Sequence, residues 1–122
     1  MRYINAIIIV LILAAQPVYA ADKWTKQDYT LEASYMVFHF IDWRQTRYIA
    51  KNPDDYNELN PILGDHPETW EVDAWFIGTA LLHPIVTHFL PEKYRSVWQG
   101  ITLGASMTTV GWNFQMGVRM DF

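Results

Sequence analysis

Two long stretches without a formal charge lie in the second half of this 122-residue chain, and they constrain its fold more than any other feature. The first, residues 74–90, has 17 residues, and the second, residues 96–118, has 23. A helix needs roughly 20 apolar residues to cross a bilayer. We therefore predict a transmembrane helical hairpin, kinked at Pro84 because proline removes a backbone donor. Gly100 and Gly104 lie four residues apart and are expected to let a helix pack closely against its neighbour.

Residues 1–20 have the pattern of a secretory signal peptide. Arg2 precedes ten unbroken apolar residues, 6–15, and Val18 and Ala20 occupy the −3 and −1 positions of a cleavage site. Cleavage after Ala20 leaves a single domain of residues 21–122; the alternative is an uncleaved anchor helix. Mass spectrometry of the mature protein should find Ala21 at the N-terminus, whereas a retained Met1 would contradict cleavage.

The rest of the chain predicts an all-α fold, a small helical bundle with one amphipathic helix packed on the kinked transmembrane hairpin. Residues 28–50 lack Gly and Pro and form the amphipathic helix, and the hairpin helices cover about 72–90 and 95–117. Residues 51–71, rich in Pro and acidic side chains, form a loop. Residues 113–122 alternate apolar and polar side chains, which leaves open whether they form a strand or an extended tail.

The charge distribution excludes one class of partner and predicts a topology. The chain carries a net charge of −4 and has no cluster of Lys and Arg, so we expect no nucleic acid partner. Lys93 and Arg95 lie between the hairpin helices, whereas the other connection is acidic. The positive-inside rule then places the protein in a bacterial inner membrane, with the acidic loop and the C-terminus in the periplasm. An outer-membrane location is the alternative.

Four polar residues stand out within the apolar pattern. Asp42 and Thr46 interrupt the apolar stripe of the first helix, and His39 and His83 accompany them. A buried acid must be paired or protonated, so we expect Asp42 to bond a Trp or His of a neighbouring helix or a nearby Arg. The functional alternative is a metal site formed by His39, Asp42 and His83. No established metal, nucleophile or phosphate-binding motif is present, so no cofactor and no catalytic residue is predicted.

Two segments carry a resemblance to a group of proteins. The sequences DWRQTRYI at 42–49 and NPILGDHP at 60–67 resemble a pattern in small uncharacterised helical membrane proteins of proteobacteria and their phages. The resemblance covers roughly residues 38–117. It implies a helical fold and a membrane location, and it implies no catalytic role for any residue.

The expected function is that of a non-enzymatic accessory or interaction protein of the envelope. Its expected partners are membrane lipid and another membrane protein or a second copy of itself. If the gene is carried by a phage, modification of the host envelope is the expected role. The first alternative is a small membrane enzyme or metal-dependent protein using His39, Asp42 and His83. The second is a soluble periplasmic binding module.

Overall fold

The computed structural model describes residues 21–122, so the expected signal peptide at residues 1–20 lies outside the described residues. Three helices follow one another: α2 (Lys26–Lys51), α3 (Thr69–Phe89) and α4 (Glu92–Gln115). Within residues 21–122 there is no strand, which confirms the all-helical prediction for this part of the chain. The expected bounds differ from the observed ones by one to three residues.

The helix starts are fixed by local hydrogen bonds. At α2 the Asp28 backbone N–H donates to the Thr25 hydroxyl, and the Thr25 N–H donates to the Asp28 carboxylate, which together form a capping box. α4 begins directly after Pro91, where the Glu92 N–H donates to the carboxylate of Asp22 at 3.0 Å. Because of this early start, Lys93 and Arg95 belong to α4 and not to the loop in which they were expected.

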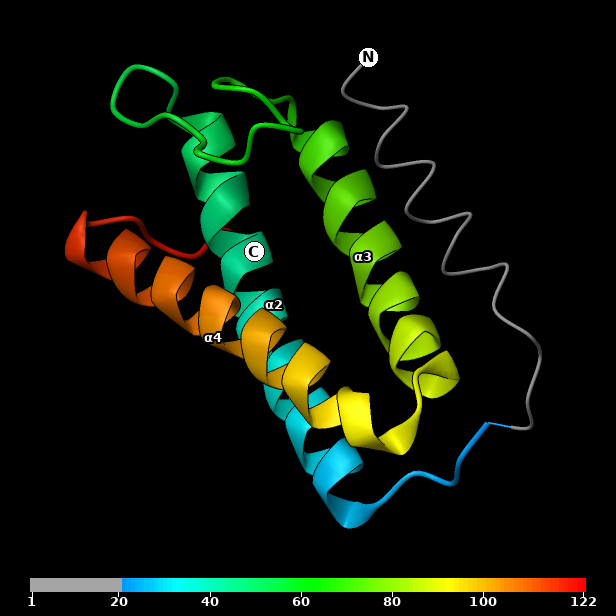
Figure 1. Cartoon of the computed structure of the whole chain (residues 1–122). Helices are drawn as coiled ribbons and strands as arrows, with labels where there is room; N and C mark the ends of the chain where they lie inside the picture. Colours follow the sequence, from blue (N-terminus) through cyan, green and yellow to red (C-terminus); the bar gives the residue numbers. More distant parts are fainter. Residues whose placement is uncertain (1–20) are drawn as a thin grey trace.

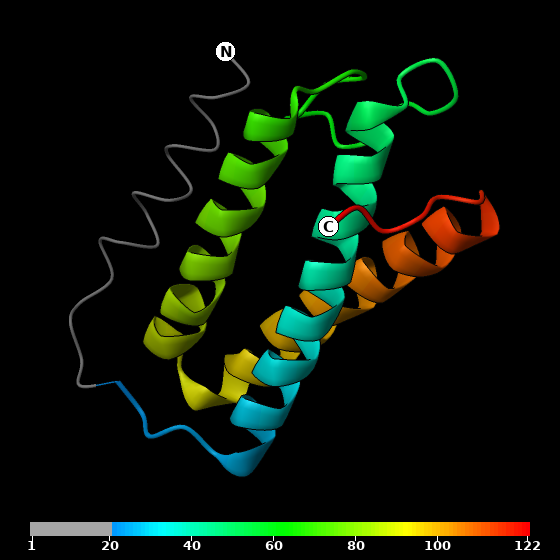
Figure 2. The same ribbon diagram turned by 180° about the vertical axis from the view of Figure 1, so that it is seen from behind.

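α2 lies between the other two helices. Figures 1 and 2 show α3 and α4 diverging from their tight connection, with α2 running alongside α3 and crossing α4. α2 packs most extensively on α4 and next on α3, whereas the backbones of α3 and α4 come close at few positions and these two helices meet through side chains. The bundle is therefore held by α2 and is not a closely packed α3–α4 hairpin with α2 added.

The C-terminal segment is a tail that turns back onto α2. Gly117 has a φ of +81°, and the Val118 N–H donates to the Asn113 carbonyl at 2.9 Å, which closes α4 with a Schellman turn. The tail then runs back to α2 (Figures 1 and 2), where the Asp121 N–H donates to the carbonyl of Arg44. The alternating pattern of residues 113–122 thus reflects the end of a helix followed by an extended tail.

The interior of the described bundle is more polar than apolar. Six apolar side chains are buried, against ten polar or charged ones. The buried polar or charged residues are Asp28, Glu32, His39, Gln45, Thr46, His83, Thr87, Arg95, Gln99 and Asn113. Large apolar side chains lie instead on the outer faces of α3 and α4, such as Leu81 at 65% and Ile101 at 68% exposure. None of the helices in residues 21–122 combines the length and the hydropathy of a membrane-crossing segment.

Candidate functional site

A chain of three side chains, one from each helix, lies at the centre of the bundle. The Nδ1 of His83 on α3 is 2.6 Å from a carboxylate oxygen of Glu32 on α2. The Nε2 of the same ring is 2.7 Å from the hydroxyl of Thr102 on α4. His83 and Glu32 are buried, and Thr102 is half-buried. This carboxylate–imidazole–hydroxyl chain joins all three helices through one histidine.

The second carboxylate oxygen of Glu32 is also fully engaged. It accepts hydrogen bonds from the Gln99 amide at 2.9 Å and the Thr87 hydroxyl at 3.2 Å. Burial alone would raise the pKa of Glu32, but hydrogen bonds from His83, Gln99 and Thr87 hold this pKa below its ordinary value. Glu32 is therefore an ionised carboxylate inside the bundle, and its charge is balanced by donors from α3 and α4.

A second histidine, His39, lies on α2 about two helical turns after Glu32. The Nε2 of His39 is 3.0 Å from the carbonyl of Phe76, and its Nδ1 is 3.2 Å from the Tyr35 hydroxyl. Because a carbonyl can only accept, Nε2 carries the proton and Nδ1 accepts from Tyr35. Burial lowers the pKa of His39, in agreement with a neutral ring. Burial, followed by the nearby carboxylates, raises the pKa of Tyr35 to about 12, so its hydroxyl keeps the proton that it donates.

Aromatic stacking packs the central histidine firmly. The Tyr35 ring lies 3.6 Å from the His83 ring, centroid to centroid, at an interplanar angle of 15°. The Trp98 ring lies on His83 at 4.9 Å and 23°. Trp98 also donates its indole N–H to the Thr87 hydroxyl at 3.1 Å. The His83 ring therefore has a fixed orientation, as a proton-transferring group requires.

Asp42 and Thr46 lie away from this centre. The Thr46 hydroxyl donates to the Asp42 carboxylate at 3.3 Å, one helical turn away on α2. Burial, and then the carboxylate of Glu58, raise the pKa of Asp42 to about 7. The expected bond from Asp42 to a Trp or His of a neighbouring helix or to an Arg is not formed in residues 21–122. The indole N–H of Trp43 donates instead to Asp73 at 2.7 Å.

The four polar residues predicted from sequence do not form one site. His39 and His83 both lie in the buried interior, but each has its own hydrogen-bond partners, and Asp42 bonds only within α2. Among residues 21–122 no three His, Cys, Asp or Glu side chains are placed to hold a metal ion. The described geometry therefore gives no support to a metal site of His39, Asp42 and His83.

Gly100 and Gly104 have no packing role inside the described bundle. Both lie on the exposed face of α4, and a Cβ added at either would meet nothing within 4 Å. Their expected role in helix packing thus stays a prediction about a separate chain.

Arg95 is a structural centre that the sequence pattern did not reveal. Its side chain is 0% exposed. Its guanidinium donates to Asp28 at 3.1 Å and to backbone carbonyls of two chain segments. These carbonyls belong to Asp22, Lys23, Thr87, His88 and Leu90. Arg95 therefore ties the segment before α2 to the last carbonyls of α3, where a cation also complements the helix dipole.

A second ionic cluster holds the tail. The Arg47 guanidinium pairs with Asp73 of α3 and, at 3.1 Å, with Asp121 of the tail. Lys51 adds a 2.8 Å contact to Asp121. The hydrogen bond from Lys51, and then that from Arg47, lower the pKa of Asp121 although burial opposes them. Nearby, the Asn113 amide donates to the Gln45 side chain at 3.1 Å, which joins α4 to α2.

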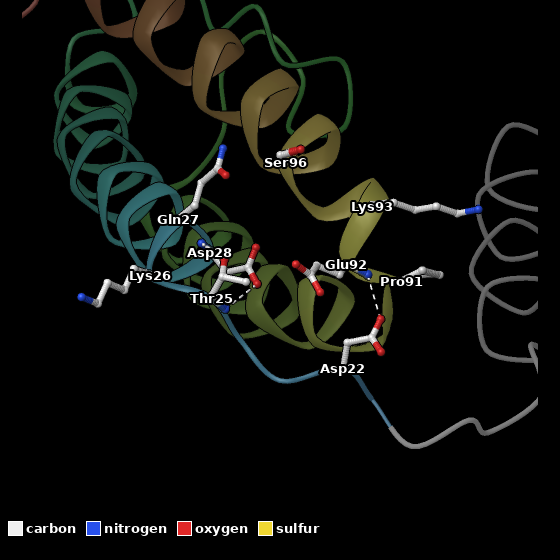
Figure 3. Close-up of a pocket in the computed structure, with 9 residues that line it drawn as sticks. All are labelled: Asp22, Thr25, Lys26, Gln27, Asp28, Pro91, Glu92, Lys93 and Ser96. Carbon is white, nitrogen blue, oxygen red and sulfur yellow. Dashed lines mark hydrogen bonds between the residues drawn. The ribbon is translucent and has the colours of Figure 1, made fainter.

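An open hollow lies where the starts of α2 and α4 meet (Figure 3). Asp22 in its wall already accepts from the Glu92 N–H, drawn as a dashed line, and Asp28 is engaged by Thr25 and Arg95. The lining carries no unpaired buried polar side chain that could select a ligand, so the interior chain centred on His83 is the stronger candidate.

The comparisons with known proteins identify no relative of this chain. No protein family model matches the chain, and neither a curated protein nor a solved structure is significantly similar to it.

Proposed function

We propose that the protein is an accessory or interaction protein of the bacterial envelope that resides in the inner membrane. The observation that carries this proposal is the distribution of polarity: polar side chains fill the interior, and large apolar side chains cover the outside. In water such an arrangement is unfavourable, because apolar surface stays hydrated while polar groups lose their hydration. In a bilayer the outer side chains contact acyl chains, and the interior hydrogen bonds hold the helices together.

The two faces of α3 illustrate the point. Its buried face presents His83 and Thr87 to the other helices, whereas Ile77, Leu81 and Ile85 point outward. A hydropathy averaged along the helix combines both faces, although only the outer face would contact lipid. α4 follows the same rule, with Arg95 and Gln99 inside and Ile101 outside. This facial separation supports lipid contact by the outer surfaces of α3 and α4.

The interior network supports a role that depends on a defined surface. Helix association through paired polar groups fixes orientation more specifically than apolar packing does, because each misplacement leaves a buried donor or acceptor unpaired. The result is a rigid scaffold with an apolar perimeter and an acidic loop at residues 52–68, which a lipid or a membrane protein could recognise. If the gene is carried by a phage, this scaffold would act on the host envelope.

Membrane residence can be tested in the cysteine-free chain. Leu81→Cys and, as the matched control, Asp54→Cys in the acidic loop would each be labelled with an environment-sensitive fluorophore after reconstitution. We expect nitroxide-labelled lipids to quench the fluorophore at position 81 and not the one at position 54. We also expect the protein to remain with membranes in alkaline carbonate. Release by carbonate, together with equal quenching at both positions, would favour the soluble periplasmic binding module.

The proposed topology has its own test. A reporter fused after Phe122 is expected to be active in the periplasm, and one inserted at Lys93 is expected to be active in the cytoplasm. The structure supplies the opposing expectation: Asp22, which follows the expected cleavage site, accepts a hydrogen bond from the Glu92 N–H, so an exported N-terminus would place Lys93 on the periplasmic side. A Lys93 reporter active in the periplasm would therefore contradict the arrangement argued from the charge of the loops.

A further inference from the structure

We propose that Thr102 is a nucleophile, activated by His83 and Glu32, that accepts an acyl group from a neutral ester. The order hydroxyl–Nε2, Nδ1–carboxylate is that of the serine hydrolase triad, with distances of 2.7 and 2.6 Å. This set differs from the enzyme alternative drawn from the sequence, because Thr102 and Glu32 replace His39 and Asp42. The inference rests on the proposed function only in that membrane lipid would be the natural source of the ester.

The hydrogen bonds determine where the protons lie. A carboxylate can only accept, so the proton between Glu32 and His83 resides on Nδ1, and Nε2 of a neutral ring is left as an acceptor. The Thr102 hydroxyl is closer to this nitrogen, at 2.7 Å, than to the Trp98 carbonyl at 3.0 Å. When the ring gains a second proton, the hydroxyl can rotate to donate to that carbonyl and accept from Nε2–H. The site thus accommodates both protonation states of His83 without moving the backbone.

The remaining contacts suit a general base. The second oxygen of Glu32 is held by Gln99 and Thr87, so the carboxylate cannot turn away from His83. Tyr35 and Trp98 stack on the ring and fix its plane. A general base oriented in this way by a third group is the feature that distinguishes an activated nucleophile from an ordinary hydroxyl.

The reaction balances with no additional reactant except water. The Thr102 oxygen attacks the ester carbonyl carbon while its proton passes to Nε2 of His83. The tetrahedral intermediate collapses, the bond to the leaving oxygen breaks, and that oxygen takes the proton from Nε2 and departs as an alcohol. Water then attacks the acyl-threonine and gives one proton to Nε2; the acid leaves, and the Thr102 oxygen recovers that proton. The net change is ester plus water to acid plus alcohol.

The surroundings select an uncharged, apolar substrate. No Asp, Glu, Lys or Arg occurs in residues 74–90 or 96–118, which include His83 and Thr102. Leu82 and Ile101, the immediate neighbours of these two residues, are exposed at 47% and 68%. These two side chains lie on the outer surface, so an ester that approaches from that surface meets apolar side chains, whereas a charged substrate would find no partner on these stretches of α3 and α4.

Ser106 is placed to assist as a hydrogen-bond donor to the oxyanion. It follows Thr102 by one helical turn and is half-buried on the same face of α4. Its hydroxyl makes no hydrogen bond within residues 21–122, unlike those of Thr108 and Thr109, which donate to their own helix. A free hydroxyl near the attacked carbonyl can stabilise the oxyanion of the intermediate.

The test uses the full chain in detergent with p-nitrophenyl butyrate as the probe. We expect a burst of p-nitrophenolate approaching one equivalent per protein, and a butyryl group on Thr102 within the tryptic peptide of residues 96–119. Thr102→Val should reduce the acylation rate by at least about 100-fold, and Thr102→Ser should retain it, as expected for loss and retention of a base-activated hydroxyl. Ser106→Ala should slow acylation without moving the butyryl group.

Thr108→Val is the matched control, because it makes the same substitution on α4 at an exposed hydroxyl that donates only to its own helix, and it leaves the Thr102–His83 contact intact. It should still be acylated at position 102. The proposal is overturned if Thr102→Val, folded as judged by circular dichroism, reacts like the parent, or if the label lies on another residue. It is equally overturned if no burst occurs. The probe is soluble in water, so this outcome is independent of the result on membrane residence.

Discussion

Replacing Arg95 with methionine is expected to lower the free energy of unfolding by about 3–5 kcal/mol, the cost of breaking a buried ion pair by removing one partner. The guanidinium is fully buried, and its loss leaves the Asp28 carboxylate without its cation. The backbone carbonyls at the end of α3 and in the segment before α2 lose a donor as well. Denaturant unfolding in detergent, followed by circular dichroism, measures the change.

Two further variants separate charge from geometry at this position. Arg119→Met removes an exposed arginine and should change stability by less than about 0.5 kcal/mol, as is usual for surface sites. Arg95→Lys keeps the charge, but an ammonium group cannot replace the fork of donors that reaches both segments, so most of the loss should persist. A stability of Arg95→Met equal to that of Arg119→Met would contradict the structural role of the buried guanidinium.

The helical periodicity was sufficient to predict the fold class. The segment without Gly and Pro, residues 28–50, corresponds to α2. The two uncharged stretches correspond to α3 and α4. The proline-rich segment between α2 and α3 is a loop, as expected. Helix ends were less predictable, because Pro91 and the Asp22 carboxylate start α4 before Lys93. Contacts between residues 70 positions apart leave no local pattern in a sequence.

The candidate site was only partly visible in the sequence. The sequence pattern indicates His83 but not its partners Glu32 and Thr102. Their contacts with His83 depend on how the three helices pack together. One signal was present: Asp28, Glu32, Tyr35, His39, Asp42 and Thr46 recur along α2 at three- and four-residue steps. The face of α2 that carries these six residues is thus polar and points into the bundle. We instead assigned the stripe to apolar side chains interrupted by Asp42 and Thr46.

Asp42 shows how the environment can reverse an expectation. From sequence alone, loss of this carboxylate should remove a bond to a neighbouring helix and destabilise the protein. The structure gives Asp42 only the hydroxyl of Thr46 and places the carboxylate of Glu58 near enough to raise its pKa. Since the pKa of the folded form is about 7, the folded protein holds this proton more tightly than the unfolded chain does. The corresponding stability is present at acidic pH and is lost as the pH rises through about 7.

We therefore expect Asp42→Asn to be more stable than the parent at pH 8, by roughly 1–3 kcal/mol after allowance for partial exposure. The difference should shrink towards pH 5, because the parent is then protonated and the amide resembles the neutral acid. Two other shifted groups also make stability depend on pH: the raised pKa of Glu58 acts in the same direction as that of Asp42, and the lowered pKa of His39 acts in the opposite one. Because both proteins contain these other groups, the difference in unfolding free energy between Asp42→Asn and the parent at each pH reflects mainly Asp42. The control Asp54→Asn, at an exposed carboxylate in the acidic loop of residues 52–68, should show no such pH-dependent gain. If Asp42→Asn is instead less stable than the parent at pH 8, the carboxylate is ionised and stabilising, and the assigned direction of its pKa shift is wrong.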